Sequence, residues 1–437
     1  AVALLVAAVG FLIGQSCRLV FTATHEQTDF SVFFRTAREL AAGADGTLYS
    51  RPDAPTGWPQ CAPPITSVAF LPLQGLSIGA AAGVWAAVNL GLLGVAAWAI
   101  WRLYAHLDRQ HRLFRATRLW AAVLLLSLAN GCLQTGQVTI LLVTCWLSYL
   151  AATARRRHFL AALGLALPVA MKFYPGLMWA IPVGIRARRQ LILLPAALAL
   201  FSVVIPLLVY GPRAWDLSRG YVEAMFIGDV PRLETCFDVN RVSTESLDVL
   251  LLRWLTHDPV WHEQVTWFPH LRLPRRPVLA LANVLRGIIL LVAGLTLWRY
   301  RPEAARRPVH GALMLAALSA ATLYLTQPDP KSRYALYAFP AFLPLLAWTT
   351  AAWRLARRRR AVSLALFTIL CAVCIAQLTP TILRYFEVSL LATFAVWLAL
   401  VRHLTRITPR RSCEPAVPAA PPPPAGPPPS ADEPAPR

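Results

Sequence analysis

Residues 78–118 have the sequence IGAAAGVWAAVNLGLLGVAAWAIWRLYAHLDRQHRLFRATR, in which an uncharged apolar block, 78–101, leads directly into a linker with five arginines, 102–118. The apolar block is long enough to cross the ~30 Å hydrocarbon core of a bilayer as a helix. Arginines concentrated in a short linker beside such a block are typical of the cytoplasmic side of a membrane protein. The stretch therefore predicts one membrane-spanning helix and the side on which it ends.

The same alternation of apolar blocks and basic linkers continues through the whole chain of 437 residues. Hydrophobic residues make up 57% of it and charged residues only 14%, against about a quarter charged in a soluble domain. The other apolar blocks are 2–21, 119–133, 138–153, 159–171, 175–185, 191–210, 278–298, 309–326, 334–353, 361–380 and 388–403. We therefore expect an all-α, polytopic membrane domain of about 12 transmembrane segments over residues 1–403.

The distribution of basic residues orients this domain. With the N-terminus placed inside, 24 of the 42 basic residues fall in the cytoplasmic linkers, which are 102–118, 154–158, 186–190, 299–308, 354–360 and 402–411. The short outer linkers hold only four, as the positive-inside rule requires. The net charge of +21 thus lies between apolar blocks and forms no aromatic-interleaved basic groove. We expect contacts with membrane lipids and no nucleic-acid partner.

Two long segments, 22–77 and 211–277, are expected on the outer side, where they would roof an active site. The first contains an amphipathic pattern from Phe30 to Ala42, and the second a helix-like stretch at 246–255. Each outer segment also holds a cysteine, Cys61 and Cys236. Whether these two cysteines pair is left open by the sequence.

The blocks 159–171 and 175–185 are each too short to span a membrane, for which ~20 residues are needed. Together they predict a hairpin whose tip, 171–176, contains Pro175 and Gly176, both helix breakers. Non-helical backbone at membrane depth survives only against protein or a water-filled cavity. The tip is therefore a candidate part of an active site.

The end of the chain, residues 404–437, differs in composition from the rest. Eleven of the 36 prolines fall within 412–437. Such a segment cannot form a packed core. We expect a disordered, partly polyproline-II cytoplasmic tail.

Only two of the 42 basic residues are lysines, Lys172 and Lys331, and both fall in short outer linkers. A lysine offers a compact point charge where an arginine offers a planar fork. Lys331 and Arg333, within the polar cluster 327–334, also suit a phosphate at headgroup depth. The alternative for all three is ordinary solvation of loops at the membrane surface.

A polar and acidic run, His25, Glu26 and Asp29, follows the first apolar block and precedes the expected amphipathic helix. A carboxylate held within hydrogen-bond reach of a hydroxyl can act as a general base. Asp29 is our candidate for this general base, although an acidic residue just outside a first helix is usually a solvated one. The amides of 130–137, Gln137 among them, hydrogen-bond either sugar hydroxyls or helix ends.

Several motifs, in their order along the chain, carry a resemblance to a known family. They are Asp29-Phe30, Ala37, Leu40, Gly43, Leu48-Tyr49, Pro63-Pro64, Phe70-Leu71-Pro72-Leu73, Gly136-Gln137, Lys172-Phe173-Tyr174-Pro175 and Glu245-Ser246-Leu247. In these residues the chain resembles glycosyltransferase family 87, the polyprenyl-phosphate-mannose-dependent α-1,2-mannosyltransferases of actinobacteria. It departs from that family at Ala62, where the family has Tyr, and at Thr244-Glu245, where it has Asn-Gln. Both departures bear on the acceptor.

The resemblance implies a GT-C fold, an outward-facing site, inversion at the sugar carbon and an Asp base, without a nucleotide sugar, cofactor or dedicated metal ion. We therefore expect an inner-membrane glycosyltransferase that takes mannose from polyprenyl-phosphate-mannose to a glycolipid or polysaccharide acceptor of the cell envelope. Asp29 is expected to deprotonate the acceptor. The residues expected to bind donor are Lys172, Lys331 and Arg333 at its phosphate, and Gln137 and Tyr174 at its sugar.

Two other functions are compatible with the composition. A transporter or flippase of lipid-linked saccharides would also have about twelve segments, but it would show two related halves, and no internal repeat is evident. A non-catalytic assembly partner would not require Asp29. A sugar-transfer assay and replacement of Asp29 separate the three.

Overall fold

The computed structural model describes residues 2–25, 28–50, 62–107, 114–172, 174–224, 246–256, 273–327, 332–352 and 388–407. All regular secondary structure in these ranges is helical, so the expected helical class is confirmed for this part of the chain. Cys61, Cys236, Lys331 and the block 361–380 lie outside the described residues, as does the tail beyond residue 407.

The longer elements coincide with the apolar blocks of the sequence. They are α1 (Val2–His25), α4 (Ile78–Leu107), α5 (Phe114–Thr135), α6 (Thr139–Ala154), α7 (His158–Met171), α9 (Arg188–Ala199) continued by η4 (Leu200–Val204) and α10 (Ile205–Tyr210), α15 (Arg275–Arg306), α16 (Pro308–Thr326), α17 (Phe339–Ala352) and α20 (Val388–Ile407). The shorter elements lie between them. They are α2 (Asp29–Ala41), η1 (Gly46–Ser50), α3 (Pro64–Val68), η2 (Leu71–Leu73), η3 (Tyr174–Trp179), α8 (Ala180–Gly184), α11 (Arg213–Val222), α13 (Leu247–Leu255) and η6 (Ser332–Ala338).

Within the described ranges, five stretches of helix are long and apolar enough to cross a membrane: α4, the continuous run Arg188–Tyr210, α15, α16 and α20. The expected count of about 12 spans is not confirmed. Part of the difference comes from apolar helices that are too short to span a membrane, such as α6 and α7. The expected hairpin consists of such short elements: α7 ends at Met171, and the chain returns through η3 and α8.

The helices differ in how much of their surface is covered by protein. α16 is the central helix, with every residue from Gly311 to Leu325 buried. The outer faces of the run 188–210 and of α15 are apolar and open, with Leu208 80%, Ile192 74% and Trp298 65% exposed. Contiguous apolar surface of this extent is unfavourable in water and is suited to lipid. Together with the helix lengths, it indicates a multi-pass membrane protein.

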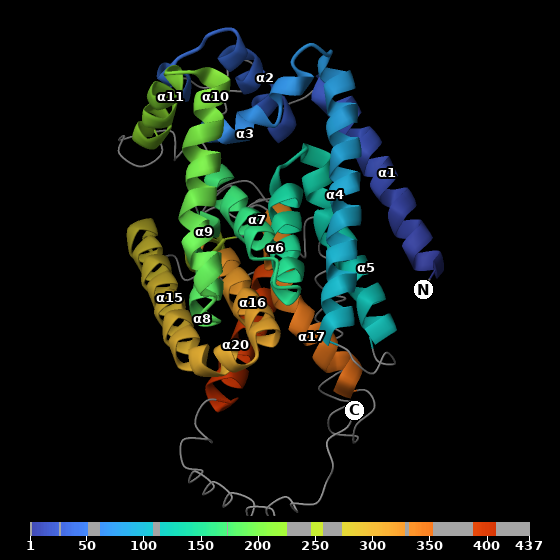
Figure 1. Ribbon diagram of the computed structural model, residues 1–437, viewed down its shortest axis with the longest axis vertical. Helices are drawn as coiled ribbons and strands as arrows, with labels where there is room; N and C mark the ends of the chain where they lie inside the picture. The colour runs from blue at the N-terminus through green and yellow to red at the C-terminus, as the bar shows by residue number, and fades with distance from the viewer. Residues whose placement is uncertain are drawn as a thin grey trace, which may run out of the picture.

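A group of short helices covers one end of the bundle, between and beside the upper ends of α4 and α10 (Figure 1). This group, which we call the cap, consists of α2, η1, α3, η2 and α11. A small core between the cap and the end of α10 contains six buried side chains, Leu40, Leu48, Tyr49, Tyr210, Ala214 and Leu217. Burial, together with the neighbouring Tyr210 and Tyr221, raises the pKa of Tyr49 far above its ordinary value, so the residue stays neutral.

The cap joins the two long segments that the sequence places on one side of the membrane. Arg213 Nη2 donates a hydrogen bond to the backbone oxygen of Leu40 at 3.1 Å. Gly46 and Gly220 meet backbone to backbone, and a Cβ on either would collide with the other's chain. The described part of segment 22–77, at Leu40 and Gly46, is therefore fixed against α11, the first helix of segment 211–277.

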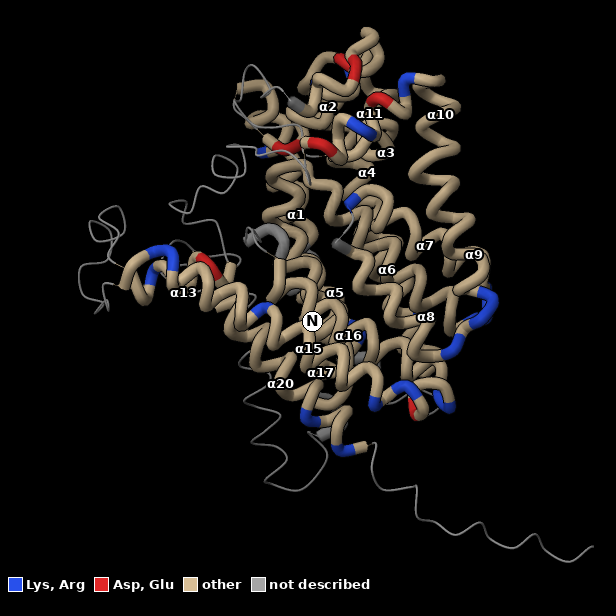
Figure 2. Tube along the Cα trace, turned by 90° about the vertical axis from the view of Figure 1, so that its left-hand side faces the viewer, with Lys and Arg blue, Asp and Glu red and all other residues tan. Residues whose placement is uncertain are grey.

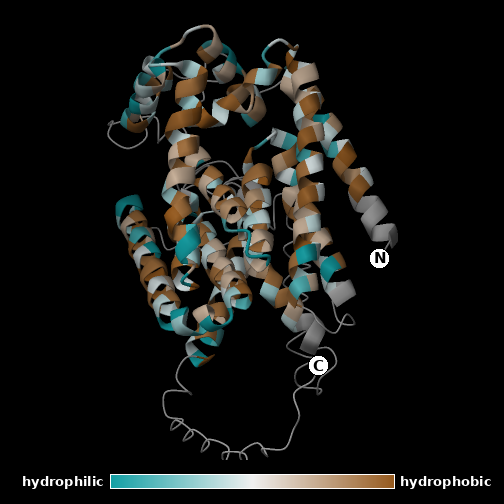
Figure 3. Cartoon of the chain, in the orientation of Figure 1, coloured by the Kyte–Doolittle hydropathy of each residue, from teal (hydrophilic) through white to brown (hydrophobic). Residues whose placement is uncertain are grey.

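The charges are divided between the two ends of the bundle. Figure 2 shows most of the acidic positions in the cap and most of the basic positions at the opposite end. Between these two ends, the long helices of the bundle are largely hydrophobic (Figure 3). This polarity is the one that the alternation of basic linkers predicts, and it places Asp29 at the end poor in arginine.

Candidate active site

Asp29 is the first residue of α2, and the local sequence explains its position. Thr28 is the N-cap: its side chain accepts a hydrogen bond from the Ser31 backbone N–H at 3.1 Å, and the Ser31 hydroxyl accepts one from Thr28 N–H at 3.0 Å. This reciprocal box stops the chain from fraying at the start of the helix. A carboxylate in the first turn also interacts favourably with the helix dipole. Asp29 is thus held in a capped turn and is 9% exposed.

The start of α2 packs directly on the turn that carries Gln137. Gly136 has φ +67°, and Gly136 and Gln137 close the C-terminus of α5 by donating their N–H groups to Leu133 and Cys132, as in a Schellman motif. A Cβ on Gly136 would lie only 2.5 Å from the Cβ of Phe30. Phe30 and Gly136 are thus in contact. Asp29 directly precedes Phe30, and Gln137, which is 1% exposed, directly follows Gly136.

The same turn is tied to the membrane helix behind it. Trp85 of α4 donates its indole N–H to the Gly136 backbone oxygen at 2.8 Å. The Phe70 ring lies 4.5 Å from that indole and 6.0 Å from the ring of Phe30, centroid to centroid. An aromatic layer thus supports the region of Asp29 and Gln137.

Lys172 follows the last residue of α7 and belongs to the tip of the hairpin. Its backbone is extended, with φ −153° and ψ 119°, and its N–H still donates to the oxygen of Pro168. The Thr66 hydroxyl of α3 donates to the oxygen of Met171 at 3.2 Å. Because α3 packs on both α2 and α7, the cap connects Lys172 to the helix that begins with Asp29. The Lys172 side chain is half-buried.

The remaining candidates are placed only as backbone. Tyr174 begins η3, directly after the tip, and Arg333 is the second residue of η6. The position of η6 is fixed by Tyr337, whose hydroxyl accepts a hydrogen bond from Thr139 at 3.4 Å, and whose ring lies 5.5 Å from that of Trp146. Thr139 begins α6, two residues after Gln137. The segment that carries Arg333 thus packs beside the helix that Gln137 precedes.

The family model of glycosyltransferase family 87 matches residues 62–328, more than half of the chain. The chain belongs to glycosyltransferase family 87. Comparisons with curated proteins and with solved structures found no match. The family 87 match includes Gln137, Lys172 and Tyr174, whereas Asp29, Lys331 and Arg333 lie beyond its two ends. Tertiary contacts, above all that of the Asp29–Phe30 turn with Gly136, connect the start of α2 to the matched region.

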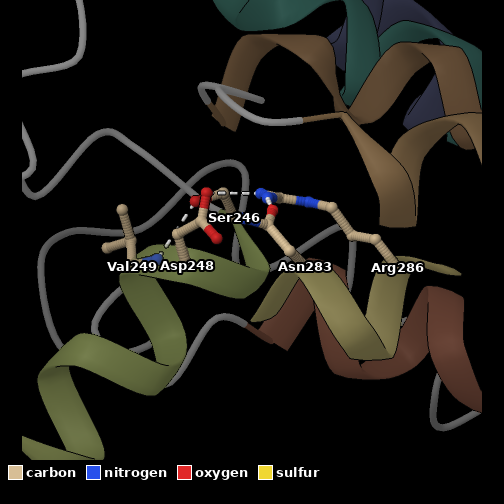
Figure 4. Close-up of polar contacts among 5 residues, drawn as sticks. All are labelled: Ser246, Asp248, Val249, Asn283 and Arg286. Carbon is tan, nitrogen blue, oxygen red and sulfur yellow. Dashed lines mark hydrogen bonds and ion pairs between the residues drawn. The ribbon is translucent and has the colours of Figure 1, made fainter. Parts of the chain in front are cut away.

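This family 87 chain also contains a largely buried ion pair, Arg286–Asp248, that the sequence did not predict. Arg286 of α15 donates to Asp248 of α13, and its other terminal nitrogen donates to Asn283 at 3.0 Å. Ser246 caps α13 by accepting from Val249 N–H at 3.1 Å (Figure 4). The side chains of Arg286 and Asp248 are 12% and 18% exposed. The pair fixes α13 against the membrane helix α15.

Only one partner of this ion pair could be recognised from the sequence. An arginine within an apolar block is costly unless it is paired, which marks Arg286 as unusual, but nothing in the sequence identifies Asp248 as its partner. Figure 2 shows α13 well below α2. The ion pair therefore lies apart from the Asp29 region and holds α13 alone against α15. Among the described residues, no three His, Cys, Asp or Glu side chains gather as metal ligands would.

Proposed function

We propose that this protein transfers a mannosyl residue from a polyprenyl-phosphate donor to a hydroxyl of a lipid-linked or cell-envelope glycan on the outer face of the membrane. Membership in family 87 supports sugar transfer. The observation that carries the proposal is the position of Asp29, a capped and largely buried carboxylate beside the Gly136-Gln137 turn of the family 87 region.

The proposed reaction is a single displacement at the anomeric carbon. Asp29 accepts the proton of the acceptor hydroxyl while the acceptor oxygen attacks the face of the sugar opposite to the phosphate. The bond between the anomeric carbon and the phosphate oxygen breaks, and the polyprenyl phosphate leaves with the electron pair. Because attack and departure occur on opposite faces, the configuration inverts. A positioned base of this kind typically contributes 10²- to 10⁴-fold to the rate.

Cationic groups are needed where the leaving phosphate gathers charge. Lys172, at the hairpin tip, has a compact charge suited to this, and Lys331 and Arg333 are proposed to share the role. Gln137 and Tyr174 are proposed to hydrogen-bond the sugar hydroxyls. Fixed charges in a site with little water stabilise a developing negative charge more strongly than they would in solution.

The test uses the full chain purified in detergent. Polyprenyl-phosphate-mannose and a lipid extract are added, and the products are identified by mass spectrometry, with their anomeric configuration determined by NMR. We expect a product heavier by one hexose, released polyprenyl phosphate, and the opposite anomeric configuration in the product. Vesicles that contain the protein and move a labelled saccharide lipid across the bilayer without forming a new glycosidic bond would instead identify a flippase and refute the proposal.

A further inference from the structure

The outer face of α4 is a continuous apolar strip that ends in aromatic residues. Val84, Val88, Val95 and Trp98 are 43–50% exposed. Their spacing of four, seven and three residues places them on one side of the helix. Trp101, which is 51% exposed, follows Trp98 by three residues. The two indoles therefore form the lower end of the strip, at the end of α4 that lies away from the cap.

Three arginines from three parts of the fold surround these two indoles. The guanidinium carbon of Arg102, on α4 itself, lies 5.3 Å from the centroid of the Trp98 ring, and that of Arg155, at the end of α6, lies 5.6 Å from it. Arg118 of α5 lies 4.2 Å from the Trp101 ring. Cation–π contacts at these distances orient the planar guanidinium groups. We call Trp98, Trp101, Arg102, Arg118 and Arg155 the Trp98 cluster.

The positive charge of this cluster is not neutralised within the described part of the chain. No Asp or Glu described by the structure pairs with the three arginines, and Arg102 and Arg155 are exposed. Other arginines at the same end of the bundle behave differently, since Arg306 and Arg307 both lie 3.6 Å from carboxylate oxygens of Glu303. The Trp98 cluster therefore has hydrogen-bond donors and charge to offer to an external anion.

We propose that the Trp98 cluster binds the headgroup phosphate of an anionic phospholipid, whose acyl chains lie along the Val84–Val95 strip of α4. A phosphate accepts several N–H bonds from guanidinium groups at once, and basic sites between membrane helices suit anionic headgroups. A zwitterionic lipid carries its own ammonium group, which competes with the arginines for the phosphate. The site lies at the opposite end of α4 from the cap (Figure 1), so it does not depend on the proposed sugar transfer.

The test measures lipid binding by the full chain, delipidated in a neutral detergent, by native mass spectrometry. Phosphatidylglycerol and phosphatidylcholine with the same acyl chains are titrated separately. We expect the first phosphatidylglycerol to bind more tightly than phosphatidylcholine. Each basic residue near a headgroup contributes roughly fivefold, so the triple variant Arg102→Gln/Arg118→Gln/Arg155→Gln should lose about 100-fold for phosphatidylglycerol and little for phosphatidylcholine.

The matched control is Arg306→Gln/Arg307→Gln, which removes arginines of the same end that already have a carboxylate partner. Phosphatidylglycerol binding should be nearly unchanged in it. Equal binding of the two lipids by the wild type, or an equal loss in the control and the triple variant, would overturn the proposal. If the triple variant does not fold, the single changes Arg102→Gln and Arg155→Gln, both at exposed positions, should each give about a fivefold loss.

One further variant tests an internal competitor. Asp108 is the one carboxylate in the linker 102–118, and it lies outside the described residues. If the cluster is open to lipid, Asp108→Asn should leave phosphatidylglycerol binding unchanged or strengthen it. A loss of binding in Asp108→Asn as large as in the arginine variant would refute the proposed site.

Discussion

Replacing Asp29 by Asn keeps the size of the side chain and removes its basicity, because an amide cannot accept the acceptor's proton. We expect turnover to fall by at least about 100-fold while the protein still folds and binds donor. Glu26, three residues earlier, is the competing carboxylate and lies outside the described residues, so Glu26→Gln is the matched control and should be nearly silent. Sugar transfer and donor binding are measured on the same preparations.

The two variants together separate the possible outcomes. Normal turnover in Asp29→Asn with an inactive Glu26→Gln would move the base to Glu26 and leave the class of reaction intact. Normal turnover in both would exclude the displacement mechanism proposed for this protein.

Substitutions of Lys172 test whether this residue binds the donor phosphate. Lys172→Ala should weaken donor use by about 1.5–3 kcal/mol, the scale of a hydrogen bond to a charged group. Lys172→Arg should restore only part of it, because a planar fork does not replace a point charge at a tight hairpin tip. Donor kinetics are compared in both variants. Wild-type kinetics in Lys172→Ala would show that Lys172 only solvates the tip.

At the level of elements, the position of α2 depends on its close contact with the turn between α5 and α6. A side chain at Gly136 meets both a positive φ and the Cβ of Phe30, so Gly136→Ala should destabilise the protein by about 1–3 kcal/mol. Because Phe30 follows Asp29, turnover should fall as well. Gly91→Ala is the control: nothing lies within 4 Å of its Cβ position, and alanine favours a helix by about 0.5–1 kcal/mol. Thermal unfolding in detergent measures both.

The contact of α13 with α15 depends on one ion pair. Removing either partner leaves a largely buried charge, so Asp248→Asn or Arg286→Met should cost up to about 3–5 kcal/mol. The double variant Asp248→Leu/Arg286→Met should recover most of this loss, because no charge is then left unpaired. The exposed pair Arg219–Glu223 provides the comparison, and Arg219→Gln should shift the melting temperature little. Equal losses in the single and double variants would show that the pair is not coupled.

For the whole molecule, the separation of charge between the two ends predicts the topology. Reporter fusions at residues 105 and 156 should report the cytoplasm, as should one at 357, whereas fusions at 50, 240 and 330 should report the outside. The reason is that arginine-rich linkers are retained on the inner side. A cytoplasmic result at residue 50 would place the cap, and with it Asp29, in the wrong compartment for the proposed donor.

Local sequence was enough for the helical class and for several boundaries. The amphipathic pattern of 30–42 became α2 (Asp29–Ala41), and the stretch 246–255 became α13 with Ser246 as its cap. These predictions succeed because side-chain periodicity and capping are properties of residues three or four apart. The end of the α-helix at the hairpin tip was also predictable, because Pro175 has no backbone N–H and its ring would clash with the carbonyl four residues earlier, at Met171, where α7 ends.

The number of spans was not determined in this way. Apolar composition marks segments that avoid water, but it does not distinguish a helix covered by lipid from one covered by protein. Both α16 and the run 188–210 are apolar enough to span. Yet α16 is buried along its length, whereas the run exposes Ile192 and Leu208. Only packing against other helices assigns each block to one of these environments.

The sequence alone therefore determined the helical membrane class, the polarity of charge and the individual candidate residues. What only the tertiary structure decided is which segments meet: the start of α2 and the Gln137 turn, through Phe30 and Gly136; the hairpin tip and α3; and α15 and α13, through Arg286 and Asp248. These contacts join residues from 38 to more than 100 positions apart. The physical reason is that burial and ion pairing act through space, so their partners depend on how the helices pack and leave no periodic trace along the chain.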